Sequence, residues 1–381
     1  MFQLHGTRAR LFADTISPCS NTASGAGRQN AAEWLRTGFH DMATINRYFG
    51  TGGLDASLQF ELRSAENTGP GLGTTLKFLG NYISRQTSLA DLIAAGVYAS
   101  VRSCGGPIVP VKFGRKDATR AGDPGVPQPG NDITIFKNQF DRMGFTPAEM
   151  IQVVACGHTL GGVHQAEFPA LVPNAPSNGE VGFDTTVAAF DNNVVTEYLG
   201  NNSANPLVVG PAVALNQHSD FKVFNSDGNA TMRSMTNPAT FSSVCQAVFQ
   251  KMIDAVPIGV SLSAAPVTPY TVKPISMQLT LQSGGNSLLW TGLIRVRTTN
   301  IPISTIGTMT ITYKDRNGGN NCGACSVTAT LQGTSTGFDD TFAVCWPTNL
   351  ESASLKRSSS SPYLLPSRPP LESPLLSLQS I

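Results

Sequence analysis

An arginine and a histidine four residues apart, Arg36 and His40, are the first residues in the chain whose types and spacing suggest chemistry. The stretch around them has no proline and carries apolar residues at helical spacing, so we expect a helix with both side chains on one face. A permanently charged guanidinium beside an imidazole suits a reaction that moves a proton while negative charge develops. Taken alone, such a pair more often belongs to a solvated helix face.

A second histidine, His158, lies far along the chain in Val153–Gly162, which reads VVACGHTLGG. Together with Arg36–Asp41, which reads RTGFHD, this segment resembles the haem peroxidases of the plant, fungal and bacterial superfamily, in particular their secreted fungal, class II-like members. The two motifs occur in the family's order. The resemblance implies a mainly α, two-lobed helical fold, haem b as cofactor and hydrogen peroxide as oxidant.

The resemblance also implies roles for the residues of both motifs. In that family the first motif faces one side of the haem and the histidine of the second ligates the iron, so His158 is expected to be the axial haem ligand. His40 would take a proton from hydrogen peroxide and return it to the departing oxygen, and Arg36 would stabilise the developing charge. Phe39 and Phe183 are expected to flank the two histidines.

Three polar residues are implied to hold the two imidazoles in place. Glu61 and Asn67 have the spacing of the family's relay, in which the asparagine amide oxygen accepts a hydrogen bond from the distal histidine. That bond would leave the other ring nitrogen of His40 bare for peroxide, so we count Asn67 among the catalytic residues. Asp220 matches the carboxylate that accepts a hydrogen bond from the proximal histidine, here His158.

Two oxygen-rich segments match the two calcium sites of the secreted members. Calcium takes about six to eight oxygen ligands, several from backbone carbonyls, and glycine lets the backbone curl to present them. An ordinary aspartate turn is the alternative for the first segment, and a solvated loop is the alternative for the second. The expected distal ligands are Asp41, Gly53, Asp55 and Ser57, and the expected proximal ligands are Thr159, Asp184, Thr186, the carbonyl of Ala189, and Asp191.

The reducing substrate is inferred by elimination, because this chain has other residues at the positions that specialised relatives use for particular donors. Fungal manganese-oxidising relatives have three acidic residues, but here only Glu33 is acidic, and Gln29 and His164 stand at the other two positions. One carboxylate does not make the hard oxygen set that manganese prefers. The surface tryptophan of lignin-type relatives is replaced by Val153, and the ascorbate-type arginine by Glu167. We therefore expect one-electron oxidation of small phenols or aromatic amines at the exposed haem edge.

Composition and charge limit the other possible partners and the compartment. The formal net charge is +1 and only 13% of residues are charged, so there is no basic excess to indicate nucleic-acid binding, and no apolar run is long enough to span a membrane. Seven cysteines and two glycosylation sequons, at Asn201 and Asn229, favour a secreted, disulfide-containing glycoprotein. The first ten residues do not resemble a signal peptide, so we expect a missing leader, with a cytosolic form as the alternative.

The hydrophobic period changes from helical to alternating near residue 270, which predicts two domains. We expect a haem peroxidase domain at 1–262, a linker at 263–269, a small antiparallel, β-sandwich-like domain at 270–348 and a disordered tail at 349–381. Cys322, Cys325 and Cys345 are too few for a structural zinc site, so a disulfide with one thiol left over is expected among them.

Two functions from different classes remain open at this point. The first is a peroxidase, expected to be a monomer, that reduces hydrogen peroxide and oxidises small aromatic donors. The second is a non-catalytic haem- or cell-wall-binding protein on a peroxidase scaffold, whose mark would be the loss of a motif residue. For the β domain, a binding or spacing module in contact with cell-wall polysaccharide is expected rather than an enzyme.

Overall fold

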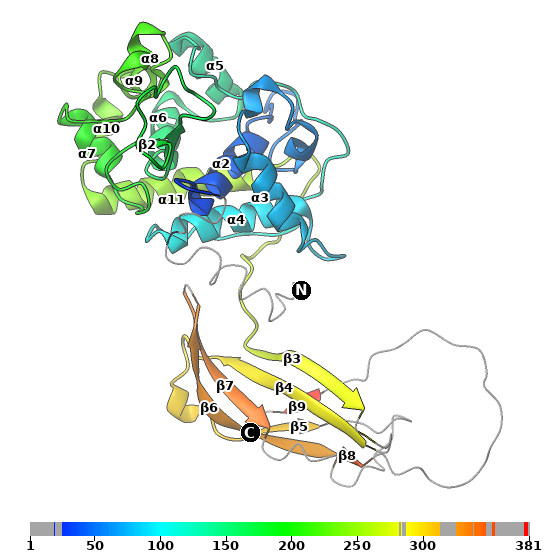
Figure 1. Cartoon of the computed structure of the whole chain (residues 1–381). Helices are drawn as coiled ribbons and strands as arrows, with labels where there is room; N and C mark the ends of the chain where they lie inside the picture. Colours follow the sequence, from blue (N-terminus) through cyan, green and yellow to red (C-terminus); the bar gives the residue numbers. More distant parts are fainter. Residues whose placement is uncertain are drawn as a thin grey trace. The chain divides into compact units, whose positions relative to one another are not determined.

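The computed structural model describes Cys19, Ser283 and residues 25–281, 287–312, 325–337, 339–347, 353–354 and 377–379. The chain forms two compact units that divide between Val267 and Thr268 (Figure 1). The first is mainly helical and the second is an antiparallel sheet, which confirms the expected fold class at this level. No helix in the described ranges combines the length and apolar character needed to cross a membrane.

The first unit contains ten α-helices among its described residues, together with one short hairpin that the sequence did not predict (Figure 1). Strands β1 (Gly162–His164) and β2 (Glu180–Gly182) form this antiparallel hairpin directly after His158. The helices are α2 (Asn30–Met42), α3 (Gly71–Gly80), α4 (Leu89–Ser103), α5 (Ile133–Arg142), α6 (Pro147–Gly157), α7 (Asn193–Leu199), α8 (Pro211–Ala214), α9 (Ser219–Phe224), α10 (Ala230–Ser234) and α11 (Pro238–Asp254).

Helix α2 carries the first motif and is packed into the centre of the helical unit. Its Trp34 is 3% exposed and lies against Phe78 of α3, with ring centroids 5.2 Å apart. Gly38 lies so close to α4 that a Cβ atom there would come within 2.4 Å of Val97. A glycine at this position therefore lets two helices approach closely, and the opposite face of α2 is left to present Arg36 and His40.

Helix α6 begins with a capping box and ends at the second motif. The Thr146 side chain accepts a hydrogen bond from the backbone N–H of Glu149, whose carboxylate bonds back to the Thr146 N–H, which makes a capping box. Cys156 forms a disulfide with Cys245 of α11. This bond attaches the end of α6 to the last helix only two residues before His158, so the second motif has a rigid support on both sides.

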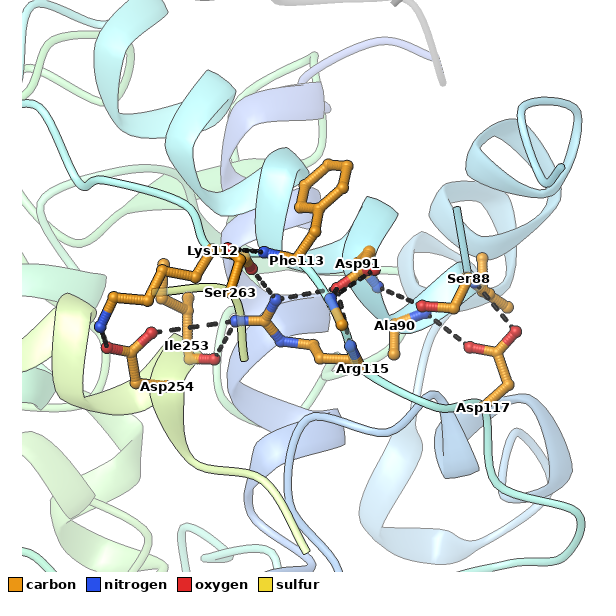
Figure 2. A network of polar contacts seen from close by, with 12 residues as sticks. Ser88, Ala90, Asp91, Lys112, Phe113, Arg115, Asp117, Ile253, Asp254 and Ser263 are labelled. Atoms are coloured by element: carbon orange, nitrogen blue, oxygen red, sulfur yellow. Dashed lines mark hydrogen bonds and ion pairs between the residues drawn. The ribbon is translucent and has the colours of Figure 1, made fainter. Parts of the chain in front are cut away.

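A buried ion pair between Asp91 of α4 and Arg115, in the segment after α4, lies against the end of α11, as Figure 2 shows. Asp91 accepts a hydrogen bond from the Arg115 guanidinium at 3.0 Å, and a second guanidinium nitrogen of Arg115 donates to the Ile253 carbonyl at 2.5 Å. Both side chains are almost fully buried, so removing one partner would leave an uncompensated charge in the interior. The segment after α11 continues along the same surface, where the Ser263 N–H donates to the Phe113 carbonyl at 2.7 Å.

The second unit is one curled antiparallel sheet whose strands are joined in the order β3-β4-β7-β6-β5-β9, with β8 paired to β4 (Figure 1). Alternate residues on the strands form its core, including Ile294, Val296, Met309 and Ile311, as the period of two predicted. The bounds are β3 (Val272–Leu281), β4 (Ser287–Arg297), β5 (Met309–Thr312), β6 (Ser326–Thr336), β7 (Thr341–Pro347), β8 (Ala353–Ser354) and β9 (Ser377–Gln379).

This arrangement differs from the two separate sheets of the expected sandwich. The described strands share one hydrogen-bonded sheet, and register shifts interrupt β3 between Ile275 and Gln278 and β6 between Leu331 and Gly333. Irregularities of this kind increase the local twist, which lets one sheet curl around its own core.

The expected tail at 349–381 lies mostly outside the described residues. Strands β8 and β9 fall within it and pair with the sheet, so the expectation of disorder is wrong at those two places.

Cys325 is disulfide-bonded and Cys345 is a free, buried thiol, in agreement with one thiol left over, while Cys322 lies outside the described residues.

Candidate active site

A cavity in the helical unit brings the two sequence motifs together. Arg36 and His40 of α2 line one part of it, and His158, at the C-terminal end of α6, lines another. Most of the remaining wall is apolar. It includes Leu35, Phe39, Phe136, Phe140, Val153, Leu160, Leu171, Phe183, Leu207, Val223, Phe249 and Met252. Apolar walls with a few convergent polar groups are typical of a cofactor or substrate site.

His40 is held by an asparagine amide. Its Nδ1 lies 2.8 Å from Asn67 Oδ1, and Asn67 Nδ2 donates to the Glu61 main-chain carbonyl at 3.0 Å. Because an amide oxygen can only accept, Nδ1 of His40 must donate, and its Nε2 keeps a bare lone pair. The Glu61 side chain is not part of this relay, since its carboxylate accepts from the Gly122 N–H at 2.7 Å.

The pKa shifts of His40 and Arg36 on α2 favour a neutral imidazole beside a positively charged guanidinium. Burial and the nearby Arg36 guanidinium lower the pKa of His40 to about 3, although the Asn67 hydrogen bond acts in the other direction. Burial lowers the pKa of Arg36 to about 10, so the guanidinium stays protonated at neutral pH. One of its nitrogens donates to the Thr68 carbonyl at 2.9 Å, which fixes the side chain at the cavity wall.

His158 is held by a carboxylate. Its Nδ1 lies 2.8 Å from Asp220 Oδ2, and Asp220, on α9, is 1% exposed. The same oxygen accepts a second hydrogen bond from Asn205 Nδ2 at 2.8 Å. A carboxylate oxygen only accepts, so Nδ1 of His158 donates and its Nε2 is free to bind a metal. The Phe183 ring stacks on the imidazole with centroids 4.1 Å apart and an interplanar angle of 10°.

Several residues of the site were not predicted from the sequence. Asn205, which supports Asp220, is a single amide in a loop, and no local pattern distinguishes it. His164, which the sequence indicated only as a replacement at a manganese-type position, is half-buried in the cavity wall, with its Nε2 3.0 Å from the Gly27 carbonyl. Its position on β1 became visible only with the hairpin, because three-residue strands leave almost no periodic signal.

An ion-paired arginine lies at the edge of the cavity. Arg28 contacts Glu167 at 2.5 Å and Glu33 at 3.5 Å, and all three residues line the cavity. The carboxylate at the manganese-type position, Glu33, is therefore already paired with a guanidinium. Gln29, at the second such position, donates to Glu180 at 2.8 Å.

The expected distal calcium residues gather around the C-terminal end of α2. The two carboxylate oxygens of Asp41 accept from the Ala56 and Leu58 N–H groups, at 2.8 and 3.0 Å. Among the described residues, the buried Ser57 hydroxyl has no hydrogen-bond partner, and Asp55 is 8% exposed. Burial raises the pKa of Asp41 to about 8. Two buried carboxyl groups beside a buried hydroxyl group fit a bound cation.

The expected proximal residues are linked directly to one another. The Thr186 hydroxyl lies 3.2 Å from Asp184 Oδ1 and 3.1 Å from Asp191 Oδ1. The Thr159 hydroxyl donates to the Asp191 carbonyl at 2.6 Å, and the Ala189 N–H donates to the Thr186 carbonyl at 2.8 Å. The second oxygen of Asp184 is buried and has no hydrogen-bond partner among the described residues, which again fits a cation.

Carboxylates alone do not form either site. Within the described residues, no group of three or more histidine, cysteine, aspartate or glutamate side chains is arranged to hold a metal ion. Each expected calcium set contains only two carboxylates, and its other oxygens come from hydroxyl groups and the backbone. The donor chemistry of both sets fits a hard cation such as calcium, which accepts such neutral oxygens.

Comparison with known proteins decides the family. The family model described as Peroxidase matches residues 18–240, more than half of the chain. The chain belongs to the peroxidase family. Its similarity to ascorbate and plant peroxidases identifies the family as the plant, fungal and bacterial superfamily, as the two motifs predicted. Haem binding is the general property that this membership implies.

Three relatives of this peroxidase-family chain indicate how far the similarity extends. It is 49% identical to a WSC domain-containing protein of Arthroderma benhamiae over 90% of this chain and 48% of that protein. It is 30% identical to L-ascorbate peroxidase 5, peroxisomal, of Arabidopsis thaliana over 37% of this chain and 50% of that enzyme. It is 25% identical to Peroxidase P7 of Brassica rapa over 64% of this chain and 90% of that enzyme. The chain thus spans about half the length of the first two.

Proposed function

We propose that the chain is a haem-dependent peroxidase that reduces hydrogen peroxide to water and oxidises small aromatic donors in one-electron steps. One observation carries the proposal. Two histidines line the same cavity, and each has its Nδ1 engaged, His40 by an amide and His158 by a carboxylate, so that each keeps a free Nε2. One free nitrogen can bind the iron of haem b, and the other can accept a proton.

His158 would hold the iron, and His40 would move the proton. When bound, haem supplies the electron transfer by which peroxide is reduced. Nε2 of His40 would take a proton from hydrogen peroxide and return it to the departing oxygen, first as general base and then as general acid. A pKa well below neutral keeps His40 unprotonated before the reaction. The Asn67 amide holds the tautomer that leaves this nitrogen bare.

The two flanking groups would stabilise charge at opposite ends of the reaction. The Arg36 guanidinium stabilises the negative charge that develops on the departing oxygen, in a cavity from which most water is excluded. The Asp220 carboxylate accepts the His158 Nδ1–H and makes the imidazole a stronger electron donor to the iron. Phe39 and Phe183 exclude water around the two imidazoles.

The donor would react at the haem edge. Arg28 bridges Glu33 and Glu167 at the cavity edge, so the carboxylate that manganese-oxidising relatives use is already neutralised here. Trp34 is buried in the core and offers no surface for a bulky donor. Small phenols or aromatic amines that reach the cavity directly are the donors that remain.

Calcium would stabilise both histidines. One ion would be held by Asp41, Gly53, Asp55 and Ser57, and the other by Thr159, Asp184, Thr186, Ala189 and Asp191. Asp41 and Thr159 directly follow His40 and His158 in the sequence. Each ion would therefore fix the end of the helix that carries a functional histidine.

The wider biological setting is also part of the proposal. We propose a secreted, monomeric, class II-like peroxidase with a two-lobed helical domain at 1–262, a linker at 263–269 and a β domain at 270–348. The disulfides Cys19–Cys104 and Cys156–Cys245 support an oxidising compartment. On β7, Trp346 is 55% exposed and can stack on a sugar ring, which supports contact with cell-wall polysaccharide. Loss of polysaccharide pull-down in Trp346→Ala would test this contact.

Steady-state kinetics of the haem-loaded protein with four donors would test the function. We expect peroxide-dependent oxidation of a phenol, and little turnover of manganese(II), a non-phenolic veratryl donor or ascorbate. Efficient, saturable manganese oxidation would overturn the donor assignment. Haem binding with no reaction with peroxide would overturn the enzyme assignment and favour the non-catalytic haem- or cell-wall-binding protein.

A further inference from the structure

Two N-glycosylation sequons lie close together in the helical unit, but their asparagine side chains have different surroundings. We infer that Asn201 carries an N-linked glycan and that Asn229 does not. The sequence rule alone, Asn-X-Ser or Asn-X-Thr, gives both sites equal standing. The inference rests on the secretory route proposed above and does not depend on the peroxidase reaction.

Asn201 is placed as a glycan acceptor should be. It is exposed and lies in the turn after α7, in the left-handed conformation with φ of 55°. Its main-chain N–H bonds to the Tyr198 carbonyl at 3.2 Å, and within the described part of the chain its side-chain amide makes no hydrogen bond. The hydroxyl of Ser203, the sequon's third residue, only accepts a bond, from the Asn205 N–H at 3.1 Å, and remains able to donate. A glycan at Asn201 would therefore displace no contact.

The Asn229 side chain already takes part in a hydrogen bond within the folded protein. Its Oδ1 accepts a hydrogen bond from the Tyr198 hydroxyl at 2.8 Å, and the Tyr198 side chain is 8% exposed. This bond fixes the amide plane of a half-buried side chain, and the residue stands at the N-cap position of α10 without a side-chain cap hydrogen bond. The hydroxyl of Thr231, the sequon's third residue, is likewise committed, because it donates to Asp227 at 2.6 Å. A glycan on Nδ2 of Asn229 would have to fit on a half-buried side chain whose Oδ1 is bound to the buried Tyr198.

The modification itself is a group transfer from a lipid-pyrophosphate-linked oligosaccharide in the secretory pathway. A bond forms between Nδ2 of Asn201 and C1 of the first sugar, and the bond between that C1 and the pyrophosphate oxygen breaks. The amide loses one proton, and the lipid pyrophosphate leaves with the bonding electrons. No oxidation or reduction is involved. The hydroxyl of Ser203 serves recognition by the transferase and is unchanged.

The test is to express the full chain behind a secretory leader in yeast and to map glycans by peptide mass spectrometry. An amidase that releases glycans converts each occupied asparagine to aspartate, so occupancy can be read at each site. We expect one glycan on the wild-type chain, on Asn201. Asn201→Gln and Ser203→Ala should both carry none, and the matched control Asn229→Gln should keep one. Two variants at the first sequon separate loss of the acceptor from a folding defect.

Glycan on Asn229 in the wild-type chain, or an unmodified Asn201, would overturn the inference. Material retained in the cells is mapped in the same way, since the transfer takes place before export. The reaction of the haem-loaded wild-type protein with peroxide is measured separately. Failure of that reaction with an occupied Asn201 would reject the proposed function alone, and normal reaction with an unoccupied Asn201 would reject only the glycosylation.

Discussion

The two histidines of the cavity have the same side chain and different partners. His40 is buried on α2 and donates to a neutral amide, whereas His158 follows α6, stacks on Phe183 and donates to a buried carboxylate. An amide fixes the tautomer without adding charge, so the free nitrogen is left bare to accept a proton. A carboxylate shares its negative charge with the ring and makes the free nitrogen a stronger metal ligand. The partner on Nδ1, and not the histidine, thus separates the two roles.

The surroundings strengthen this contrast. Burial and the positive Arg36 beside His40 disfavour a positive charge there, so the pKa of His40 is lowered. Nδ1 of His158 bonds instead to the negative Asp220, which Asn205 also supports. What the two sides share is that a predicted calcium ligand directly follows each histidine.

The largest expected effect comes from removing the base. His40→Leu should slow the reaction with peroxide by roughly 10²–10⁴-fold, because no group remains to move the proton, while the haem spectrum is retained. Stopped-flow spectroscopy at the Soret band measures the rate. His164→Leu changes another histidine of the same cavity and should stay within a few-fold of wild type. A His40→Leu protein that reacts at the wild-type rate would remove the acid–base assignment.

Exchanging the proximal carboxylate for an amide should have the next largest effect. Asp220→Asn would make the partner of His158 resemble that of His40, and we expect a loss of about 10–100-fold in peroxide reactivity. The iron reduction potential should rise, because the imidazole donates less electron density, and spectroelectrochemistry measures this. Asn205→Ala, which removes the hydrogen bond to the same carboxylate oxygen, should move the potential in the same direction by less. An unchanged potential in Asp220→Asn would contradict the role of the carboxylate.

Calcium removal should have a smaller effect and should act mainly on the proximal side. Prolonged chelation should lower activity by about tenfold and shift the haem spectrum towards a six-coordinate form, since loss of the ion near Thr159 frees His158 to move. Added calcium should restore both signals. Asp184→Asn weakens the proximal set of calcium ligands. This variant should lose the proximal ion at a lower chelator concentration than Asp55→Asn loses the distal ion. Chelated protein with wild-type spectrum and activity would remove both calcium assignments.

The smallest effect is expected from pH in the wild-type protein. The neutral form of His40 is the base, and its pKa is lowered to about 3, so the peroxide rate should stay level from neutral pH down to about 4 and fall only near 3. Asn67→Asp places a carboxylate beside His40, favours the imidazolium and should move this fall to higher pH. Stopped-flow rates across the pH range test both statements. A wild-type inflection near 6.5 would mean that neither burial nor Arg36 acts on His40.

The second unit and the contacts between distant segments show which features could not be predicted from the sequence. Alternation after residue 270 predicted the strands whose core includes Ile294, Val296, Met309 and Ile311, because strand periodicity is local. How many sheets those strands form depends on pairing between distant segments, and the single curled sheet was not predicted. In the same way, the capping box of α6 forms between residues three apart, whereas the Cys156–Cys245 disulfide that supports its far end joins distant segments and was not predicted.

By itself, the sequence determined the helices that carry Arg36, His40 and His158, since helical spacing and caps are local properties, and it determined the family through two ordered motifs. Only the tertiary structure decided which groups surround those side chains. The Glu61 main chain rather than its carboxylate supports Asn67, Asn205 supports Asp220, and Arg28 neutralises Glu33 and Glu167. These partners are far apart in the chain, and burial and hydrogen bonding act on distances in space, which no spacing along the sequence records.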